Sequence, residues 1–514
     1  MYEALLKATP EYQKVAASLG TPGPAALFGL PPAGRALLYA ALQKDLGRVL
    51  CIEAALMLLP MIAAVIYDES PVPFLITIGI TGGIGLVMWR VRAKSGGITA
   101  RDGFLIVGLS WIAMSLFGAL LFVLTGDIPN YIDALFETVS GFTTTGASIL
   151  SSVEQLPNCL LFWRSFTHWI GGMGVLVFLL SVLPMVGGSH MNLMKAESPG
   201  PIVSRLVPKV QMTAKLLYQI YLGMTILEAV ILILGKMPIF DAITITVGTA
   251  GTGGFAIRND SLASYTAFQK NVVTVFMILF GVNFNFYFFL LMRKIGQAFK
   301  MQEVRAYFLI IASAVGIITV NTVSLCGNAL QAFQDAAFQV GSVITTTGYA
   351  TVDFDKWPQL SRTIMVLLMF IGACAGSTGG GIKVSRVLIL LKSVKKELKQ
   401  YLHPSAVEKI KMDGKIVEHE VVRSTNVFMV AYVLIFAVSV LLISLDEYDL
   451  VTNFTAVAAT FNNIGPGLAL VGPTGNFGFF SNFSKVVLIF DMLAGRLEIF
   501  PLLLLFSRET WKRF

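Results

Sequence analysis

Two short segments of the chain place three consecutive threonines before a glycine. They read GFTTTGAS at 141–148 and ITTTGYAT at 344–351. Threonine hydroxyls and backbone carbonyls can face a cation together, and glycine adopts backbone conformations that are closed to other residues. Several such segments around one axis would form a ring of carbonyl oxygens that replaces the hydration shell of a cation. The chemistry that these residues indicate is therefore cation coordination in a narrow passage.

The two segments belong to a repeat that occurs four times along the chain. The aligned stretches are DALFETVSGFTTTGAS (133–148), DAITITVGTAGTGGFA (241–256), DAAFQVGSVITTTGYA (335–350) and, more distantly, TNFTAVAATFNNIGPG (452–467). In the first three, an aspartate precedes the glycine by 13 residues, as in the pairs Asp133 and Gly146, Asp241 and Gly254, and Asp335 and Gly348. The fourth has Thr452 at that offset before Gly465. The equal offsets favour a shared structural role over a set of unrelated loop turns.

Each repeat predicts a hairpin that enters the membrane and turns back. Aspartate is a good helix N-cap, so we expect the three aspartates to cap short helices. About nine helical residues rise only about 14 Å, roughly half of a hydrocarbon core. The chain then returns in extended form, which requires that it line water instead of lipid. The negative ends of the four helix dipoles would point at the same place.

We therefore predict a selectivity filter at the tips of the hairpins. Its residues are Thr143, Thr144, Thr145, Gly146, Thr252, Gly253, Gly254, Thr345, Thr346, Thr347, Gly348, Asn462, Asn463, Ile464 and Gly465.

The elements that position these hairpins are apolar runs long enough to cross a bilayer. The 514 residues are 55% hydrophobic and 13% charged, with a mean hydropathy of +0.74. Runs of about 20 apolar residues predict transmembrane spans. They cover 46–67, 72–90, 103–125, 160–187, 214–235, 270–292, 306–326, 361–393, 424–445 and 482–506. The expected fold is an all-α polytopic membrane protein with four pseudo-symmetric helix–pore-loop–helix repeats around one central pore, preceded by two extra transmembrane helices.

The expected organisation follows from these spans. It comprises a cytosolic tail at 1–44, two extra helices at 45–95, and pore repeats at 96–190, 205–300, 303–400 and 420–508. The tail contains Glu3 and Glu11 and has no cleavable apolar core, so we do not expect a signal peptide.

Basic residues cluster after every second span, and the alternate connections hold most of the acids. The positive-inside rule then places both termini in the cytoplasm of a cell with a cytoplasmic (inner) membrane. The rule also accounts for the net charge of +8, so no nucleic-acid partner is needed. Cys51, Cys159, Cys326 and Cys374 show no paired spacing, which argues against disulfides or a metal centre.

Other functional classes fit the sequence less well. GSTGGGIK at 376–383 imitates a phosphate-binding loop, but Ile382 stands where that motif needs glycine. The four histidines form no metalloprotease motif or nucleophile–base pair, and the longest polar segment, about 394–423, is too short for an ATPase domain. We expect no enzyme activity and no organic cofactor.

The eighth and tenth spans predict a gate. The run 361–393 would be about 50 Å long as one helix, and its glycine-rich centre should break it at mid-depth. Arg496 lies within the tenth span, and an arginine inside a membrane is usually functional. The expected gate consists of Arg496 and the loop residues Gly376, Ser377, Thr378, Gly379, Gly380 and Gly381.

Four segments resemble the Trk-type potassium transporters, the ion-conducting subunits of the Trk/Ktr/HKT superfamily, and the TrkH-like branch most closely. They are SGFTTTGAS, AESPGP at 196–201, NNIGPG at 462–467 and DMLAGRLEIFP at 491–501. The resemblance covers roughly 46–506 and implies a pore made by one chain, a homodimer, and a cytosolic TrkA-type nucleotide-binding ring that controls conduction. The basic stretch KSVKKELKQ at 392–400 is where we expect that ring to dock.

The resemblance also implies that potassium is the substrate. The ion would bind at Thr144, Thr145, Thr252, Gly253, Thr346, Thr347, Asn463 and Ile464. In this superfamily a serine at the first filter glycine accompanies sodium permeation, so the four glycines predict selection of potassium over sodium. Two departures stand out: the 44-residue tail is long for the branch, and the fourth hairpin carries asparagines in place of threonines. The alternatives are a subunit of an ATP-driven potassium pump and a sodium-permeable member of the same superfamily.

Overall fold

The computed structural model describes residues 32–91, 100–172, 174, 210–404 and 408–511. Residues 1–31 of the expected tail, most of the second half of the predicted span 160–187, and the stretch 196–201 lie outside the described residues.

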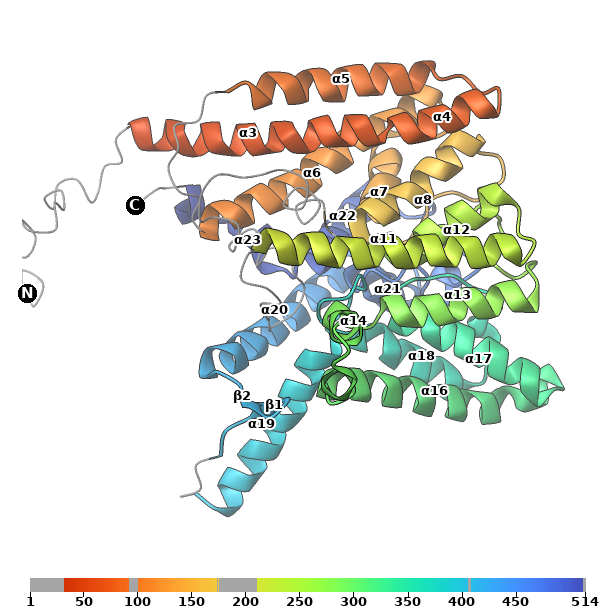
Figure 1. The fold of residues 1–514 in the computed structure, drawn as a ribbon, viewed down its shortest axis with the longest axis vertical. Coiled ribbons are helices and arrows are strands. Elements are labelled where there is room, and N and C mark those ends of the chain that lie inside the picture. The colour runs from red at the N-terminus through yellow and green to blue at the C-terminus, as the bar shows by residue number, and fades with distance from the viewer. Residues whose placement is uncertain (1–31, 92–99, 173, 175–209, 405–407, 512–514) are drawn as a thin grey trace, which may run out of the picture.

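Two helical segments precede the repeats and pack side by side (Figure 1). They are α3 (Pro32–Leu56) with its continuation α4 (Leu58–Ile66), and α5 (Val72–Trp89). Glycines allow the close approach of α3 and α5, because a Cβ on Gly47 would lie 2.6 Å from the carbonyl oxygen of Gly85. Small residues at such contacts are typical of helix pairs in membranes.

The rest of the described chain forms four repeats, each with a long helix, a short helix and a third helix, which is interrupted in the last three repeats. The first contains α6 (Ala100–Thr125), α7 (Tyr131–Phe142) and α8 (Asn158–Gly172). The second contains α11 (Val210–Leu234), α12 (Ile239–Gly251), α13 (Ala267–Phe280), α14 (Phe284–Leu291) and α15 (Ile295–Ala298). The third contains α16 (Gln302–Cys326), α17 (Ala329–Ile344), α18 (Gln359–Ile371) and α19 (Val384–Leu402). The fourth contains α20 (His419–Ile443), α21 (Leu450–Phe461), α22 (Asn482–Arg496) and α23 (Phe500–Phe506).

The remaining elements are short. A two-stranded antiparallel hairpin, β1 (Lys411–Met412) and β2 (Lys415–Ile416), lies between α19 and α20. Single 3-10 turns occur at Phe354–Lys356, Ser444–Asp446, Ala469–Val471 and Arg508–Trp511. The fold is thus the all-α membrane fold that the sequence predicts, with four pseudo-symmetric repeats around a central pore.

Within the described residues, six helices are long and apolar enough to cross a membrane, or seven if α13 and α14, bent by 93°, count as one span. The sequence predicts ten transmembrane spans, of which only 361–393 is expected to break. That break is confirmed, since α18 ends at Ile371 and α19 begins at Val384. The runs 270–292 and 482–506 are interrupted as well, and predicting them as continuous helices was wrong. Each of these helices follows one of the short hairpins, and the chain at the break after α13 bonds to the segment between α18 and α19, since the N–H of Phe284 donates to the carbonyl of Gly376 at 3.0 Å.

The prediction that the three aspartates are N-caps is wrong. The caps are Asn130, whose Oδ1 accepts a hydrogen bond from the backbone N–H of Ile132 at 3.0 Å, and Asn328, which does the same for Leu330 at 3.0 Å. In the fourth repeat Asp449 accepts from the N–H of Thr452 at 3.0 Å. The four short helices are 12, 13, 16 and 12 residues long, because each begins before the residue aligned as its cap.

Two of the aligned aspartates instead make ion pairs within or beside the first turn. Asp133 Oδ1 lies 2.6 Å from Lys485 Nζ, which joins the first short helix to α22. Asp241 Oδ2 lies 3.1 Å from Arg258 Nη2. The equal spacing therefore reflects the repeat itself rather than a common capping contact.

Candidate filter and gate

Each short helix ends in the same backbone turn. The residues Thr144, Thr252, Thr346 and Asn463 occupy equivalent positions, and all have left-handed backbone angles, with φ of 56°, 56°, 59° and 55°. In the first repeat the N–H of Thr144 donates to the carbonyl of Gly141 at 3.1 Å, and the N–H of Thr145 donates to that of Ser140 at 2.8 Å. The other three repeats make the corresponding pair of bonds. This pattern is the Schellman C-cap, which satisfies the last carbonyls of a helix.

The left-handed position is usually held by glycine, and a side chain there costs about 1–2 kcal/mol. Strain of this kind gathers at functional sites, where the surrounding structure holds it in place. Asparagine tolerates this conformation better than most residues. Asn463 therefore reproduces the backbone of the threonine hairpins, although the fourth stretch diverges most in sequence.

Two residues beyond the left-handed position, each hairpin has a glycine with positive φ that touches the next hairpin. A Cβ on Gly146 would overlap the carbonyl oxygen of Gly253, one on Gly254 that of Thr347, and one on Gly348 that of Ile464. A Cβ on Gly465 would lie 2.8 Å from the carbonyl oxygen of Thr145, which closes the circle. The four hairpins thus form a ring in chain order, and the backbones of Thr145, Gly253, Thr347 and Ile464 lie at its joints.

Threonine hydroxyls pair within the first and third hairpins, and one of them also joins two hairpins. The hydroxyls of Thr143 and Thr145 lie 2.8 Å apart, and those of Thr345 and Thr347 lie 2.7 Å apart. Asn463 Nδ2 donates to Thr145 Oγ1 at 2.9 Å, which joins the fourth hairpin to the first. The structure therefore brings the residues predicted for the filter into one ring, while their role in binding an ion stays a prediction.

His168 on α8 supports the ring from behind, a role that the sequence did not indicate. Its Nδ1 lies 2.8 Å from the carbonyl oxygen of Gly141, and its Nε2 lies 3.2 Å from the backbone nitrogen of Phe255. Because a carbonyl can only accept and an N–H can only donate, the two contacts define a neutral imidazole with its proton on Nδ1. The buried ring thereby links the first and second hairpins.

The extended return segment of the first hairpin is held by a buried ion pair, also unforeseen. Glu137 Oε1 lies 2.7 Å from Arg164 Nη2, and both side chains are almost fully buried. The same carboxylate accepts hydrogen bonds from Ser148 Oγ at 3.0 Å and from the N–H of Ile149 at 3.1 Å. The repeat contains a signal for this role of Glu137. Gln339 occupies the aligned position in the third repeat, and its Nε2 donates to the carbonyl of Val352 in the return segment at 3.3 Å.

The segment 372–383, which separates α18 from α19, packs directly against the ring. The N–H of Gly380 donates to Thr346 Oγ1 at 2.6 Å, and a Cβ on Gly379 would lie 2.8 Å from the carbonyl oxygen of Thr345. Lys383, which has positive φ, donates through Nζ to the carbonyl of Gly380 at 3.0 Å. Most of this loop is buried in protein.

Arg496 is the last residue of α22, and its side chain reaches this loop. Nη1 donates to the carbonyl of Thr378 at 2.9 Å, and Nη2 donates to the carbonyls of Gly171 and Gly172 at the end of α8. The helix ends at Arg496 and the chain turns through Glu498 and Ile499, both with positive φ. The tenth span is therefore not one uninterrupted helix at Arg496, but the predicted meeting of this arginine with the loop is confirmed.

The acidic residues near Arg496 in sequence have other partners. Glu498 pairs with Arg386 on α19, with Oε2 2.5 Å from Nη2. Asp491 accepts a hydrogen bond from Ser439 Oγ at 2.6 Å. Among the described residues, the loop is thus flanked by two arginines, one bonded to carbonyls and one to a carboxylate.

A chain with four hairpins that close a carbonyl ring, and with a loop packed under that ring, defines a polytopic membrane protein with a pore-loop architecture. Residues 74–513 match the family model described as "TrkH: Cation transport protein". The chain therefore belongs to the TrkH family of cation transport proteins.

The relatives agree with this assignment over nearly the whole chain. The "Trk system potassium uptake protein TrkH" of Salmonella typhimurium is 36% identical over 483 residues, which cover 92% of this chain and 99% of that protein. The protein of the same name from Vibrio parahaemolyticus is 37% identical over 485 residues, with 92% and 99% covered. A crystal structure of "the Potassium Transporter TrkH from Vibrio parahaemolyticus" is similar with a TM-score of 0.82 and 34% identity, covering 92% of this chain and 100% of that one.

Proposed function

We propose that this protein takes up potassium across the cytoplasmic membrane through the central ring. The observation that carries the proposal is the closed contact of four equivalent hairpins, each with a left-handed residue and a filter glycine. Backbone carbonyls at such a ring can replace the water around a cation. The relatives named as potassium uptake proteins support potassium as the substrate.

Selection of potassium over sodium would rest on the backbone of the ring. The ion would be bound by Thr144, Thr145, Thr252, Gly253, Thr346, Thr347, Asn463 and Ile464. All four filter glycines are present, and a side chain on any of them would press on a neighbouring carbonyl. This favours a potassium-selective pore over the sodium-permeable alternative.

The loop under the ring would be the gate. Its backbone bonds to a filter threonine through Gly380, and Arg496 bonds to the carbonyl of Thr378. A guanidinium at this place raises the barrier to a passing cation, and the glycines of 379–381 give the loop the freedom to move. Conduction would then require that the loop leave the ring.

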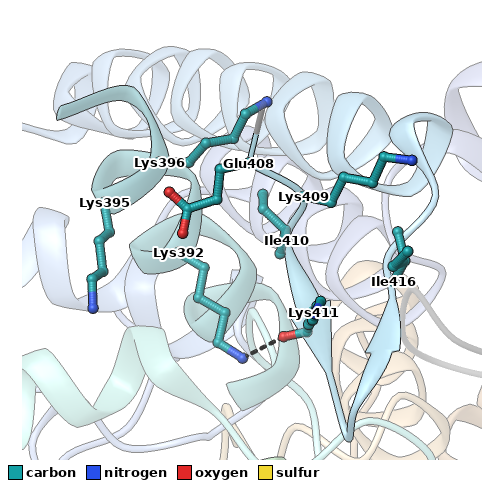
Figure 2. A pocket seen from close by; sticks show the side chains of 8 residues that line it. All are labelled: Lys392, Lys395, Lys396, Glu408, Lys409, Ile410, Lys411 and Ile416. Atoms are coloured by element: carbon teal, nitrogen blue, oxygen red, sulfur yellow. Dashed lines mark hydrogen bonds between the residues drawn. The ribbon is translucent and has the colours of Figure 1, made fainter. Parts of the chain in front are cut away.

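A cytosolic nucleotide-binding ring would regulate this gate and dock on the basic end of α19. The helix extends beyond the other helices, and the β1–β2 hairpin lies beside it (Figure 1). Lysines surround a hollow of about 580 Å³ between the two elements (Figure 2), namely Lys392, Lys395, Lys396, Lys409 and Lys411, with Glu408 as its one acidic lining residue. Lys392 Nζ donates to the carbonyl of Lys411 at 2.7 Å, which fixes the hairpin against the helix. Such a surface suits an acidic partner. The chain would act as a homodimer with both termini in the cytoplasm.

Ion flux into proteoliposomes that contain only this chain tests the proposal. We expect uptake of potassium and rubidium to exceed that of sodium, and Arg496→Ala to raise potassium flux without loss of selectivity. A matched control is Arg258→Ala, which removes an outer arginine paired with Asp241. Equal sodium and potassium flux in the parent protein would contradict the selective pore. Arg496→Ala protein that reaches the membrane and conducts no faster than the parent would place the gate elsewhere.

A further inference from the structure

Both ends of the loop 372–383 bond to one carboxylate on another helix. Glu303, the second residue of α16, is 6% exposed. Its Oε1 accepts hydrogen bonds from the N–H of Ala375 at 2.6 Å and from the N–H of Ser385 at 3.1 Å. Ala375 lies near the start of the loop and Ser385 lies in the first turn of α19, just after the loop. A single carboxylate oxygen therefore bridges the two sides of the loop.

The second oxygen of this carboxylate joins the loop to the break between α13 and α14. Asn283 Nδ2 donates to Glu303 Oε2 at 3.3 Å, and Asn283 is also the N-cap of α14. Two backbone bonds run beside it: the N–H of Phe284 donates to the carbonyl of Gly376 at 3.0 Å, and the N–H of Cys374 donates to that of Gly281 at 3.0 Å. Every neighbour that bonds to Glu303 is thus a donor, and the loop is fixed to two repeats at once.

The start of α19 depends on Glu303 for its first turn. The residue at the N-cap, Lys383, offers no side-chain cap to the helix. A carboxylate near a helix N-terminus satisfies free N–H groups and favours the helix dipole. Glu303 supplies that carboxylate from α16, so the closed position of the loop and the start of α19 rest on the same group.

We propose that Glu303 is the positioning residue that holds the loop in its closed place under the ring. The inference rests on the proposed gate, because Glu303 would be the group whose hydrogen bonds hold the loop closed; we call this role the lock. The loop cannot leave the ring without losing the bond of Ala375 to Glu303, and a movement that carries the start of α19 with it loses the bond of Ser385 as well. Loss of a hydrogen bond to a charged group shifts a two-state equilibrium by roughly ten- to a hundredfold. Removing Glu303 should therefore raise the open population by about that factor.

The test compares Glu303→Gln and Glu303→Ala with the parent protein in proteoliposomes. We expect potassium flux to rise in both variants and more in the alanine variant, with an unchanged ratio of potassium to sodium flux. Glu303→Asp, which keeps the charge, should restore part of the closed behaviour. The matched control is Glu53→Gln, an isosteric change of a carboxyl that is 1% exposed and accepts no hydrogen bond within the described part of the chain.

A second readout follows the loop itself. Cys374 is a fully buried free thiol beside Ala375. In a background with Cys51, Cys159 and Cys326 changed to alanine, a membrane-permeant maleimide should label Cys374 about tenfold faster in the Glu303→Gln variant than in the parent. A purely structural role of Glu303 would lower the melting temperature without this selective exposure.

The outcomes distinguish the proposed role of Glu303, which is to hold the loop, from the proposed role of the loop, which is to control conduction. If shortening Gly379–Gly381 raises flux and the Glu303 variants change neither flux nor labelling of Cys374, the lock is wrong and the gate stands. If Cys374 is exposed but flux does not rise in any loop variant, the gate proposal fails and Glu303 positions a loop that does not control conduction. Faster labelling together with higher flux at unchanged selectivity supports the lock.

Discussion

Gly146→Ser tests whether the contact between neighbouring hairpins sets selectivity. Gly146 has φ of 78°, and a Cβ there would overlap the carbonyl oxygen of Gly253. The carbonyl is backbone, so it cannot yield as the end of a flexible side chain would. The serine therefore has to displace a ligand of the proposed ion site.

The expected fall in potassium selectivity follows from the geometry of this contact. Restoring an ordinary contact requires the carbonyl to retreat by about 1.5 Å, a shift that forfeits much of its interaction with a bound ion. The left-handed backbone adds about 1–2 kcal/mol of strain for a residue other than glycine. If the displaced carbonyl weakens potassium relative to sodium by only about 1.4 kcal/mol, the ratio of potassium to sodium flux falls about tenfold.

The ring also predicts that substitutions of the four glycines lower the ratio of potassium to sodium flux by different amounts. The added Cβ at Gly465 would lie 2.8 Å from the carbonyl oxygen of Thr145, a milder contact than at the other three positions. Gly465→Ser should therefore lower the flux ratio less than Gly146→Ser does. Gly126→Ser is the matched control, because Gly126 has φ of 84° and no atom within 4 Å of the added Cβ. The Gly126→Ser variant has the same left-handed backbone strain, but at a position away from the ring contacts.

The assay is uptake of rubidium and sodium tracers by proteoliposomes with equal amounts of each variant. A flux ratio in the Gly146→Ser variant equal to that of the parent, in protein with a normal melting temperature, would refute the carbonyl ring as the basis of selection. A fall in the Gly126→Ser variant of the same size would show that strain alone produces the effect.

His168→Leu removes the bonds to Gly141 and Phe255, so the free energy of unfolding should fall by about 2–3 kcal/mol and sodium flux should rise. Thermal unfolding and tracer flux check both, and an unchanged flux ratio would restrict His168 to packing. Asp449→Ala should cost about 1 kcal/mol as a lost N-cap, whereas Asp449→Asn should keep the cap. The hydrogen bonds from Thr452 lower the pKa of Asp449, so its stabilising charge is fully present above the unfolded pKa of about 4 and is lost as the pH falls through the folded value. Melting temperatures between pH 3 and 7 should therefore depend less on pH in the asparagine variant, and equal pH dependence would contradict this role.

The sequence predicts the parts of this protein that are local or repeated. The two TTTG stretches and the repeat around them, with its equal offset from aspartate to glycine, located the hairpins, since a repeated turn leaves a repeated pattern in the sequence. The glycine-rich segment 372–381 predicted the break after α18, because consecutive glycines weaken a helix without reference to its surroundings. The meeting of Arg496 with Thr378 also followed from these two features.

The parts that failed depend on contacts between distant segments. Asp133 satisfies the local rule for a cap, but Lys485, 352 residues away, pairs with it while Asn130 caps the helix. The breaks after α13 and α22 lie where the chain contacts distant segments: the N–H of Phe284 donates to the carbonyl of Gly376, and a Cβ on Gly495 would overlap the carbonyl oxygen of Phe461. Glu303 has no sequence signal for its role, because its donors come from two separate segments of the chain.

Because one chain supplies all four hairpins of the closed ring, a single substitution changes only one of its four quadrants. In a channel assembled from four identical subunits, one substitution appears four times, and every quadrant of the filter changes together. Here each quadrant is encoded separately, and the circle already contains an unequal member, because Asn463 stands where Thr144, Thr252 and Thr346 stand elsewhere. One quadrant can therefore vary while the other three preserve the shape of the ring. If the ring selects the ion as we propose, a single substitution would change one of its four quadrants and adjust ion preference in small steps.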